Sequence, residues 1–554
     1  MKVVVLGGYG VFGAKVVDLL VRDGHVVTVA GRSRSKAEAF VAETAPSATA
    51  MELDRDGDLA PLWQSTPEIV VDAAGPFHAY GDDPYRLARA CIRNGVHYLD
   101  LADDPEFCLG IAALDAAAKA AGVFALSGAS SVPAISSAAV ASLAAQADEI
   151  DAISTAIMPG NRAPRGRAVV ESILNQCGRP ITVPIADDMV QRRSWSQPAW
   201  FDLGQGICRK AWLMEVPDTR AFADVFGART VAFRAGMELG VMNHALAIIS
   251  WLRARSRFGN PRWFVSMLIW IAARLLPFGT DVGGMSVAVT MREDRTWICK
   301  TWRLIATAGE GPFIPAVASR VILRAPQMIA TGARPAIAEV TLDQIVQGMA
   351  DLSVTNDVVR EEITPVFPRF LGSDFGKLPK VVQGAHIVPS PRRLTGRAKV
   401  IRGRSLWARL LAGLFRFPAA TDDIAVSVLM MPEQDGEIWE RQFGTQVFRS
   451  HLRQVNEKMT ERFGPFTFTL GLHVADGALH FPVASGRLGP LPLPRLLLPV
   501  SDASETERDG RFCFDVRLKA PLTGALMVHY QGWLEPAAGS GTNTKPRQLK
   551  SAAR

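Results

Sequence analysis

A glycine-rich stretch near the start of the chain limits the possible folds more than any other feature. Residues 2–6 form a short valine-rich apolar run, and residues 14–24 (AKVVDLLVRDG) place apolar side chains at helical spacing before a terminal glycine. Between them lies the pattern G-x-G-x-x-G, formed by Gly8, Gly10 and Gly13. Between a strand and a helix, such glycines allow a tight turn and a close approach to a pyrophosphate. The stretch predicts a dinucleotide site at a helix N-terminus, with a merely flexible turn as the alternative.

The residues after the second apolar run indicate which dinucleotide is bound. The run His25 to Ala30 ends where an Asp or Glu would bind the ribose hydroxyls of NAD. The chain instead continues with Gly31, Arg32 and Ser33, and Lys36 follows. A guanidinium, a hydroxyl and an ammonium suit a 2′-phosphate, so we expect NADP(H) as the cofactor. The alternative is that these cations are the solvated start of a helix.

Further alternation of apolar runs and helical patterns predicts a doubly wound parallel sheet. Strands are expected at 68–77, 97–103 and 123–129, after a third strand that ends at Asp54 near the adenine. Ligands of such sheets lie outside the carboxyl ends of the strands, so the loop after the fourth strand should meet the nicotinamide. The predicted cofactor-binding residues are Gly7, Gly8, Tyr9, Gly10, Val11, Phe12, Gly13, Arg32, Ser33, Lys36, Asp54, Ala74, Gly75 and Pro76.

Four titratable side chains are candidates for proton transfer because we expect them at strand ends that face the cofactor. They are Tyr98, Asp100, Asp103 and His78. Each has a structural alternative, and the pair at 103–104 before a proline is typical of a turn and helix cap. The sequence selects none of the four as the catalytic acid or base.

Four segments together resemble the saccharopine-dehydrogenase-like NADP-binding oxidoreductases. They are GGYGVFG (7–13), DAAGPF (72–77), HYLDLADD (97–104) and SGASSVPAISSAAV (127–140). The resemblance covers about the first two thirds of the chain. It implies a Rossmann domain at 1–150 and an α+β substrate and dimerisation domain at 151–355, hence a homodimer. The family acts on diverse substrates, some of them lipids, so the resemblance does not imply saccharopine as the substrate.

The final third of the chain predicts a separate β-rich domain at 366–536. Short alternating strands with glycine turns favour a curved antiparallel sheet or barrel. Segments such as RFGPFTFTL and GRFCFDV resemble domain of unknown function 4166. Residues 537–554 are expected to be a disordered tail. Candidates to face a ligand inside this domain, or alternatively solvent, are Arg402, Arg404, Arg441, His473, His529 and Tyr530.

Charge and cysteine content narrow the class of partner. The 61 Lys and Arg residues are interleaved with 54 Asp and Glu residues, which argues against nucleic-acid binding, and the six cysteines show no metal-ligand spacing. We expect a cytoplasmic protein without a metal. The apolar segment 244–278 is too short to cross a bilayer easily. It is interpreted as two interior or dimer-interface helices, with a hairpin on the inner membrane surface as the alternative.

Two functions fit these observations. The leading hypothesis is an oxidoreductase that transfers a hydride between NADP(H) and an unidentified small or lipid-like metabolite. The alternative is a non-catalytic protein that senses dinucleotide while its C-terminal barrel binds a lipid or a partner. The absence of a decisive catalytic constellation in the sequence keeps the second hypothesis open.

Overall fold

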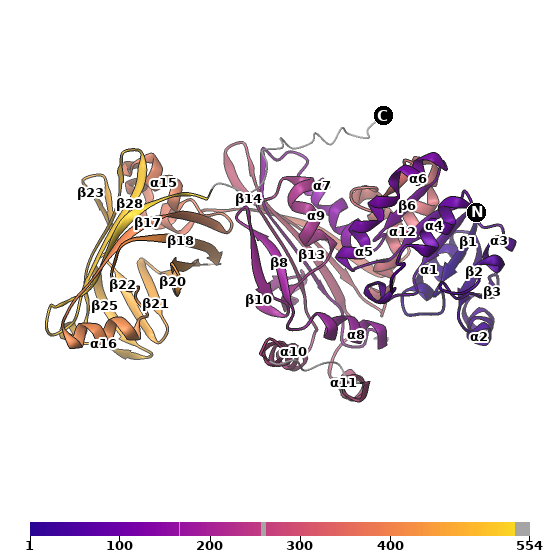
Figure 1. Ribbon diagram of the computed structural model, residues 1–554, viewed down its shortest axis with the longest axis horizontal. Coiled ribbons are helices and arrows are strands. Elements are labelled where there is room, and N and C mark those ends of the chain that lie inside the picture. The colour runs from indigo at the N-terminus through magenta and orange to yellow at the C-terminus, as the bar shows by residue number, and fades with distance from the viewer. Residues whose placement is uncertain (165–166, 256–261, 434, 538–554) are drawn as a thin grey trace.

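The structure is a computed structural model that describes residues 1–164, 167–255, 262–433 and 435–537 (Figure 1). Three large sheets follow one another along the long axis of the molecule, in chain order from the N-terminal end (Figure 1). The predicted tail lies outside the described residues except for Ala537. No helix in the described ranges has the length and apolar character needed to span a membrane.

The first sheet is parallel and has helices on both faces, which confirms the predicted doubly wound fold. Val3 and Val5 pack in one core with α1, while Val4 and Leu6 pack in another core with α3 and α4, as alternation along a strand requires. The order is β15 (Gly332–Pro335), β6 (Phe124–Ser127), β5 (His97–Asp100), β4 (Ile69–Asp72), β1 (Lys2–Leu6), β2 (Val26–Gly31) and β3 (Thr49–Glu52). The main helices are α1 (Gly13–Arg22), α2 (Arg34–Thr44), α3 (Ala60–Gln64), α4 (Arg86–Arg93), α5 (Pro105–Gly110), α6 (Asp115–Ala120) and α7 (Ser136–Leu143).

Residues 311–352 return to this first sheet, which differs from the expected division at residues 150 and 355. The segment contains α12 (Ile314–Arg324), β15 and α13 (Leu342–Gly348), and β15 pairs in parallel with β6. Arg320 of α12 is buried and donates hydrogen bonds to Asp23 at 2.7 Å and to Asp351 at 2.5 Å. The N-terminal domain is therefore built from two separate parts of the chain.

The second sheet is mixed, as the α+β expectation requires. Its only parallel pair within the described residues is β7 with β12. The order is β10 (Ser196–Asp202), β11 (Cys208–Met214), β12 (Thr230–Ala235), β7 (Glu149–Met158), β13 (Gly283–Glu293), β14 (Thr296–Ala306) and β16 (Val354–Glu362). A small hairpin, β8 (Pro180–Ile185) and β9 (Asp188–Arg193), and two helices, α8 (Arg167–Gln176) and α9 (Pro217–Phe226), pack beside it.

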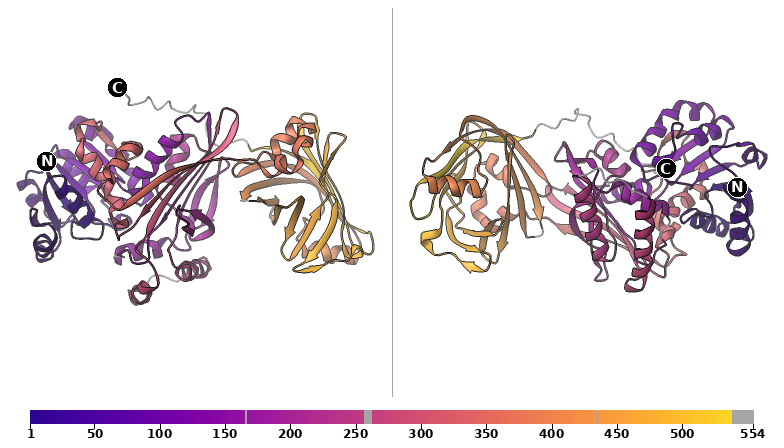
Figure 2. Two further views of the ribbon diagram at one scale, coloured as in Figure 1. Left: turned by 180° about the vertical axis from the view of Figure 1, so that it is seen from behind. Right: turned by 60° about the horizontal axis from the view of Figure 1, so that its bottom comes forward.

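The third sheet is antiparallel and strongly curved, in agreement with the predicted β-rich domain (Figure 2). Within the described residues it has 13 strands. In spatial order they are β23 (His473–Ala475), β24 (Ala478–His480), β27 (Val500–Arg508), β28 (Arg511–Lys519), β29 (Leu526–Pro536), β17 (Arg392–Arg402), β18 (Thr421–Glu433), β19 (Gly436–Phe443), β20 (Gln446–Val455), β21 (Lys458–Phe463), β22 (Phe466–Leu470), β25 (Val483–Leu488) and β26 (Leu491–Pro492). The helices of this domain are α14 (Val366–Leu371), α15 (Lys380–His386) and α16 (Leu406–Leu414).

The second and third domains are joined by packed and hydrogen-bonded contacts. Leu429 of β18 belongs to the same buried cluster as Ile181 and Leu213. The buried Ser390 hydroxyl donates a hydrogen bond to Asp151 at 2.5 Å, and Arg393 lies 2.8 Å from Asp188. These contacts fix the C-terminal domain against the middle sheet.

The segment 244–278 forms two helices, α10 (Gly240–Arg253) and α11 (Arg262–Leu275), that project from one side of the molecule (Figure 1). Their inner faces pack in a core with Leu174 and Trp212 through Leu246 and Val265. Their outer faces expose large apolar side chains, namely Val241, Ile248, Trp251, Leu252, Trp263, Met267, Trp270 and Ile271, and Leu276 and Phe278 are exposed directly after α11. The two helices are therefore not interior within a single chain, whereas the dimer-interface and membrane-surface interpretations stay predictions.

Candidate functional site

The glycine loop between β1 and α1 leaves no space for side chains. Gly7 has a φ of +75°, and a Cβ atom there would lie 2.6 Å from the Ala74 backbone. A Cβ atom on Gly13 would lie 2.1 Å from the carbonyl oxygen of Gly7, and one on Gly8 would lie 2.9 Å from that of Val5. The loop is thus pressed against both β1 and the loop after β4, as the close backbone packing of a dinucleotide site requires.

The N-terminal end of α1 offers amide groups to an anion. Among the described residues, the N–H groups of Val11, Phe12 and Gly13 donate no hydrogen bond to another residue. No acidic side chain lies in the first turn of the helix. Free amides and the positive end of the helix dipole together favour a bound phosphate. These free amides fit the pyrophosphate of NADP(H), and they belong to residues that the sequence predicted as cofactor-binding.

The loop after β2 carries exposed cations beside Tyr9. The Tyr9 hydroxyl accepts a hydrogen bond from the Ser33 N–H at 3.2 Å, and its ring lies so close to Gly31 that a Cβ there would meet it at 2.5 Å. Ser33 caps α2 by accepting a hydrogen bond from the Lys36 N–H. The guanidinium of Arg32 has no hydrogen bond or ion pair to any described residue, so its charge is available to a phosphate.

The remaining predicted cofactor residues also lie at the carboxyl edge of the sheet. Asp54 is exposed after β3 and accepts a hydrogen bond from the Asp56 N–H at 3.1 Å. Ala74 donates its N–H to the buried carboxylate of Asp72, and a cis peptide bond joins Gly75 to Pro76. The structure therefore brings the glycine loop and the loop after β4 together, with Asp54 farther along the same edge, after β3, which pairs with β2.

Tyr98 does not face this edge, contrary to expectation. Its side chain is buried in the core between β5 and the helices α3 and α4, and its hydroxyl lies 3.5 Å from Asp72. Tyr80 donates a second hydrogen bond to Asp72 at 3.1 Å, and Arg55 lies over the Tyr80 ring. Burial raises the pKa of Asp72. Tyr98, Tyr80 and Asp72 thus form an internal polar cluster beside the loop that follows β4.

Asp100 is also buried, and it connects two strand ends. One carboxylate oxygen accepts hydrogen bonds from the Ser127 hydroxyl at 2.8 Å, the Gly128 N–H at 2.8 Å and the Ala102 N–H at 3.0 Å. Burial raises the pKa of Asp100 to about 7, although these hydrogen bonds oppose the shift. Its second oxygen has no hydrogen-bond partner in the described part of the chain. The residue aligns β5 with β6, which is a structural contribution.

His78 and Asp103 are the two candidates that the structure leaves exposed at the expected edge. The His78 Nε2 atom lies 3.1 Å from the side-chain amide of Asn175, which belongs to α8 of the second domain. The loop after β4 therefore meets the second domain at a histidine. The contact to Asn175 could not be predicted, because the two residues lie in different domains and Asn175 has no distinctive sequence context.

Asp218 is a buried carboxyl near this edge that the sequence did not single out. It lies in the first turn of α9, which packs on α5, and neither of its oxygens has a hydrogen-bond partner among the described residues. Burial raises its pKa to about 7, although the nearby Ser136 hydroxyl opposes the shift. An acidic residue after Pro217 has the pattern of an ordinary helix start, so the sequence gave it no functional signal.

Comparisons with known proteins agree with the site. Residues 3–126 match the family model of the saccharopine dehydrogenase NADP binding domain, and residues 378–534 match a domain of unknown function, DUF4166. Comparison with curated proteins gives no match.

Solved structures with similar coordinates include an apo histidine-tagged saccharopine dehydrogenase (L-Glu forming) from Saccharomyces cerevisiae. It is 12% identical, with a TM-score of 0.45, and the alignment covers 65% of this chain and 99% of that one. A 3-ketoacyl-(acyl-carrier-protein) reductase from Brucella melitensis complexed with NADH is 14% identical, with a TM-score of 0.19 and coverage of 23% and 72%. The glycine loop and the free amides of α1 lie within residues 3–126, which match the saccharopine dehydrogenase NADP binding domain, and residues 378–534 match DUF4166.

Proposed function

We propose that the protein is an NADP(H)-dependent oxidoreductase whose reaction takes place at the carboxyl edge of β4 and β5. The family match of residues 3–126 supports the oxidoreductase class and the cofactor. The observation that carries the choice of NADP(H) over NAD(H) is the unpaired guanidinium of Arg32 at the end of β2, where an acidic residue would favour NAD.

The chain's own residues would bind and orient the cofactor. The amides at 11–13 hold the pyrophosphate, and Arg32, Ser33 and Lys36 bind the 2′-phosphate. NADP(H), when bound, supplies or accepts the hydride. The loop at 74–76 lies against the glycine loop and would support the nicotinamide end of the cofactor.

We assign proton transfer to His78. It is exposed, follows the loop expected beneath the nicotinamide, and contacts Asn175 from the second domain. Imidazole gains and loses protons near neutral pH, which suits a general acid or base. Asn175 is proposed to orient the ring, and Asp103 lies close enough to act on it electrostatically.

The test is cofactor consumption. Purified protein and NADPH are mixed with a panel of carbonyls, imines and enoyl thioesters that includes long-chain members, and absorbance at the reduced nicotinamide band is followed. We expect oxidation with at least one class, and loss of about a hundredfold or more in His78→Gln with unchanged NADPH binding. Tight binding of NADPH without turnover across the panel would favour the non-catalytic sensing function instead.

We also propose that α10 and α11 rest on an anionic membrane surface. The stretch 240–279 contains five arginines and no acidic residue, and its exposed tryptophans are side chains suited to the lipid interface. Arg255 lies over the Trp251 ring and Arg274 over the Trp270 ring. A homodimer that covers the same face is the competing proposal.

A further inference from the structure

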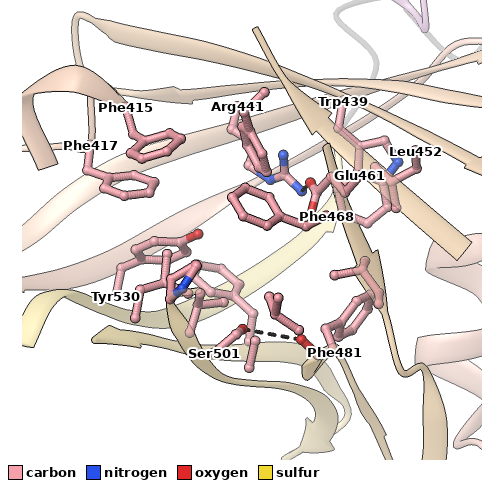
Figure 3. A pocket seen from close by; sticks show the side chains of 18 of the residues that line it. Phe415, Phe417, Trp439, Arg441, Leu452, Glu461, Phe468, Phe481, Ser501 and Tyr530 are labelled. Carbon is pink, nitrogen blue, oxygen red and sulfur yellow. Dashed lines mark hydrogen bonds and ion pairs between the residues drawn. The ribbon is translucent and has the colours of Figure 1, made fainter. Parts of the chain in front are cut away.

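The curved third sheet encloses a cavity that is separate from the dinucleotide site. Its volume is about 210 Å³, and its wall is formed by side chains from most of the longer strands of the third sheet and from α15 and α16 (Figure 3). Most of the lining is apolar and much of it aromatic, including Phe415, Phe417, Phe468 and Phe481. Tight packing is the norm inside proteins, so a space of this size lined by hydrocarbon indicates a site for an apolar molecule.

The apolar lining of the cavity contains an ion pair, formed by Arg441 and Glu461. Arg441 donates hydrogen bonds to the Ser450 hydroxyl at 2.7 Å and to Glu461 at 3.2 Å, and its guanidinium lies over the Trp439 ring. Both members of the ion pair are largely buried, with 15% and 14% of their side chains exposed. Removing an ion pair from water is unfavourable, so its presence in an apolar cavity is better explained by recognition than by stability.

Tyr530 shares this space with the ion pair. Figure 3 shows its hydroxyl directed toward the region between Arg441 and Phe468. Among the described residues, this hydroxyl has no hydrogen-bond partner. A buried tyrosine hydroxyl normally has a partner, so this one is available to a ligand.

Unsatisfied polar atoms also occur beside Trp439, whose ring contacts both Arg441 and His386. His386 lines it, is 1% exposed, and binds Glu505 through Nε2 at 2.6 Å, while its Nδ1 has no partner in the described part of the chain. Nearby Glu437 accepts a hydrogen bond from the Trp439 indole at 2.7 Å, and its other oxygen is also unpartnered. The charged groups around the cavity thus include more carboxyls than cations, which disfavours an anionic ligand.

One end of the cavity has an exposed apolar rim. Leu411 of α16, Leu497 and Pro521 line the cavity, and neighbouring Leu410, Leu414 and Leu496 are exposed. Isolated exposed leucines are common, but several around one opening indicate an entrance for an apolar molecule.

We propose that the DUF4166 domain binds a lipophilic, uncharged molecule, a hydrocarbon chain or ring that carries one hydroxyl or carbonyl oxygen. The hydrocarbon lies against the phenylalanines, and the oxygen is hydrogen-bonded by Tyr530 beside the Arg441–Glu461 pair. This proposal does not depend on catalysis at the dinucleotide site.

The test uses the full-length protein, stripped of bound lipid and loaded with Nile red. Decanol, 2-decanone, decane and decanoate are compared as competitors of equal chain length. We expect decanol and 2-decanone to displace the probe at concentrations at least tenfold lower than decane or decanoate. Equal competition by decanoate, or no displacement by any of the four compounds, would overturn the proposal.

Two variants locate the site. Tyr530→Phe should lower the affinities for decanol and 2-decanone about five- to tenfold and leave the affinity for decane unchanged, because only the hydroxyl is removed. Tyr85→Phe, which removes a tyrosine hydroxyl in the first domain, should change none of the affinities. An unchanged decanol affinity in Tyr530→Phe shows that the oxygen is not bound there and refutes the assignment.

Discussion

Arg32 and Arg34 are two positions apart and both exposed, yet the structure gives them different surroundings. Arg34 is paired with Glu38 at 2.8 Å within α2, whereas Arg32 has no partner among the described residues. The pair therefore offers a matched comparison for the proposed 2′-phosphate site. The sequence predicted Arg32 as a cofactor candidate from its position, which stays a prediction, but the pairing of Arg34 with Glu38 needed the structure.

Arg32→Asp is expected to lower the affinity for NADPH at least tenfold and to reduce or reverse the preference over NADH. The substitution removes a charge-assisted hydrogen bond to phosphate and adds a repulsive carboxylate. Titration of protein fluorescence with each dinucleotide measures both affinities. Arg34→Asp is the control and should keep the wild-type preference. If Arg32→Asp also keeps the wild-type preference for NADPH, the guanidinium at position 32 does not bind the 2′-phosphate.

Gly13→Ala is expected to weaken NADPH binding at least tenfold and to lower the melting temperature. The new Cβ would lie 2.1 Å from a backbone oxygen, so the loop that carries the free amides must move. Gly413→Ala adds a Cβ in α16 with nothing within 4 Å and serves as the control. Calorimetric titration with NADPH measures the effect, and wild-type affinity in Gly13→Ala would show that the loop does not hold the pyrophosphate.

Asp218 should make the fold less stable as the pH rises from about 4 to 7. Below the unfolded pKa of 3.8 the carboxyl is protonated in both states, but between 3.8 and about 7 only the unfolded chain releases the proton. Stability is lost across this window by at most about 4 kcal/mol. Asp218→Asn should remove that loss, as measured by urea unfolding at pH 5 and pH 8. Exposed Asp476→Asn should follow the wild type, and identical pH profiles for Asp218→Asn and the wild type would contradict this account.

The four proton-transfer candidates were predicted from their position at strand ends, but only two of them are exposed in the structure. Tyr98 and Asp100 lie within the predicted strand, and both faces of a doubly wound sheet are covered by helices, so their side chains are buried. His78 and Asp103 lie in loops beyond the strands and remain exposed. Local sequence predicts the edge of a sheet, while burial depends on helices that come from elsewhere in the chain.

Among the elements, α12 and β15 show why the sequence did not predict the return of residues 311–352 to the first sheet. The strand is only four residues long, and it joins the first sheet more than two hundred residues after β6. No local pattern indicates which sheet such a short strand joins. The strands of the curved domain alternate clearly, so their existence could be predicted, but their order in the sheet required long-range pairing.

Arg320→Leu is expected to destabilise the first domain by about 3–5 kcal/mol. The substitution removes the buried guanidinium that binds both Asp23 and Asp351 and so joins α12 to its neighbours. Burial disfavours ionised Asp23, but hydrogen bonds to Arg320 and Arg324 outweigh this effect and hold its pKa well below the usual value. The stabilisation is therefore present above about pH 4 and lost as the pH falls further.

Urea unfolding at pH 7 and pH 3 checks both statements, with a smaller difference between variant and wild type at the lower pH. Arg34→Leu removes an exposed pair and should cost at most about 0.5 kcal/mol. A loss of less than 1 kcal/mol in Arg320→Leu at pH 7 would mean that hydrophobic packing alone holds α12 in place.

On the scale of the whole molecule, α10 and α11 form an exposed apolar face that one chain leaves uncovered. Trp263 is 63% exposed and Trp270 is 58% exposed. The sequence showed the apolar and basic character of this segment, but it could not show that only its inner face would be packed. That outcome depends on how far α8 and the second sheet extend beneath the helices.

The combined variant Trp251→Ser, Trp263→Ser, Trp270→Ser is expected to reduce sedimentation with phosphatidylglycerol vesicles to the level seen with phosphatidylcholine vesicles. Loss of the aromatic side chains removes the apolar contact with the interface, and neutral lipid removes the attraction to arginine. Trp200→Ser removes an exposed tryptophan outside the hairpin and should sediment like the wild type. If instead the wild type is a dimer, the triple variant is a monomer and neither of them sediments with vesicles, then α10 and α11 form a subunit interface.

The helices α16, α10 and α11, which carry exposed leucines and tryptophans, lie along the same lower edge of the elongated molecule in Figure 1. Attachment at two separated points would restrict the tilt of the long axis against a bilayer. A molecule could then move sideways from the lipid leaflet into the third sheet without dissolving in water. Its exchange rate would follow the amount of vesicle present rather than its own aqueous solubility.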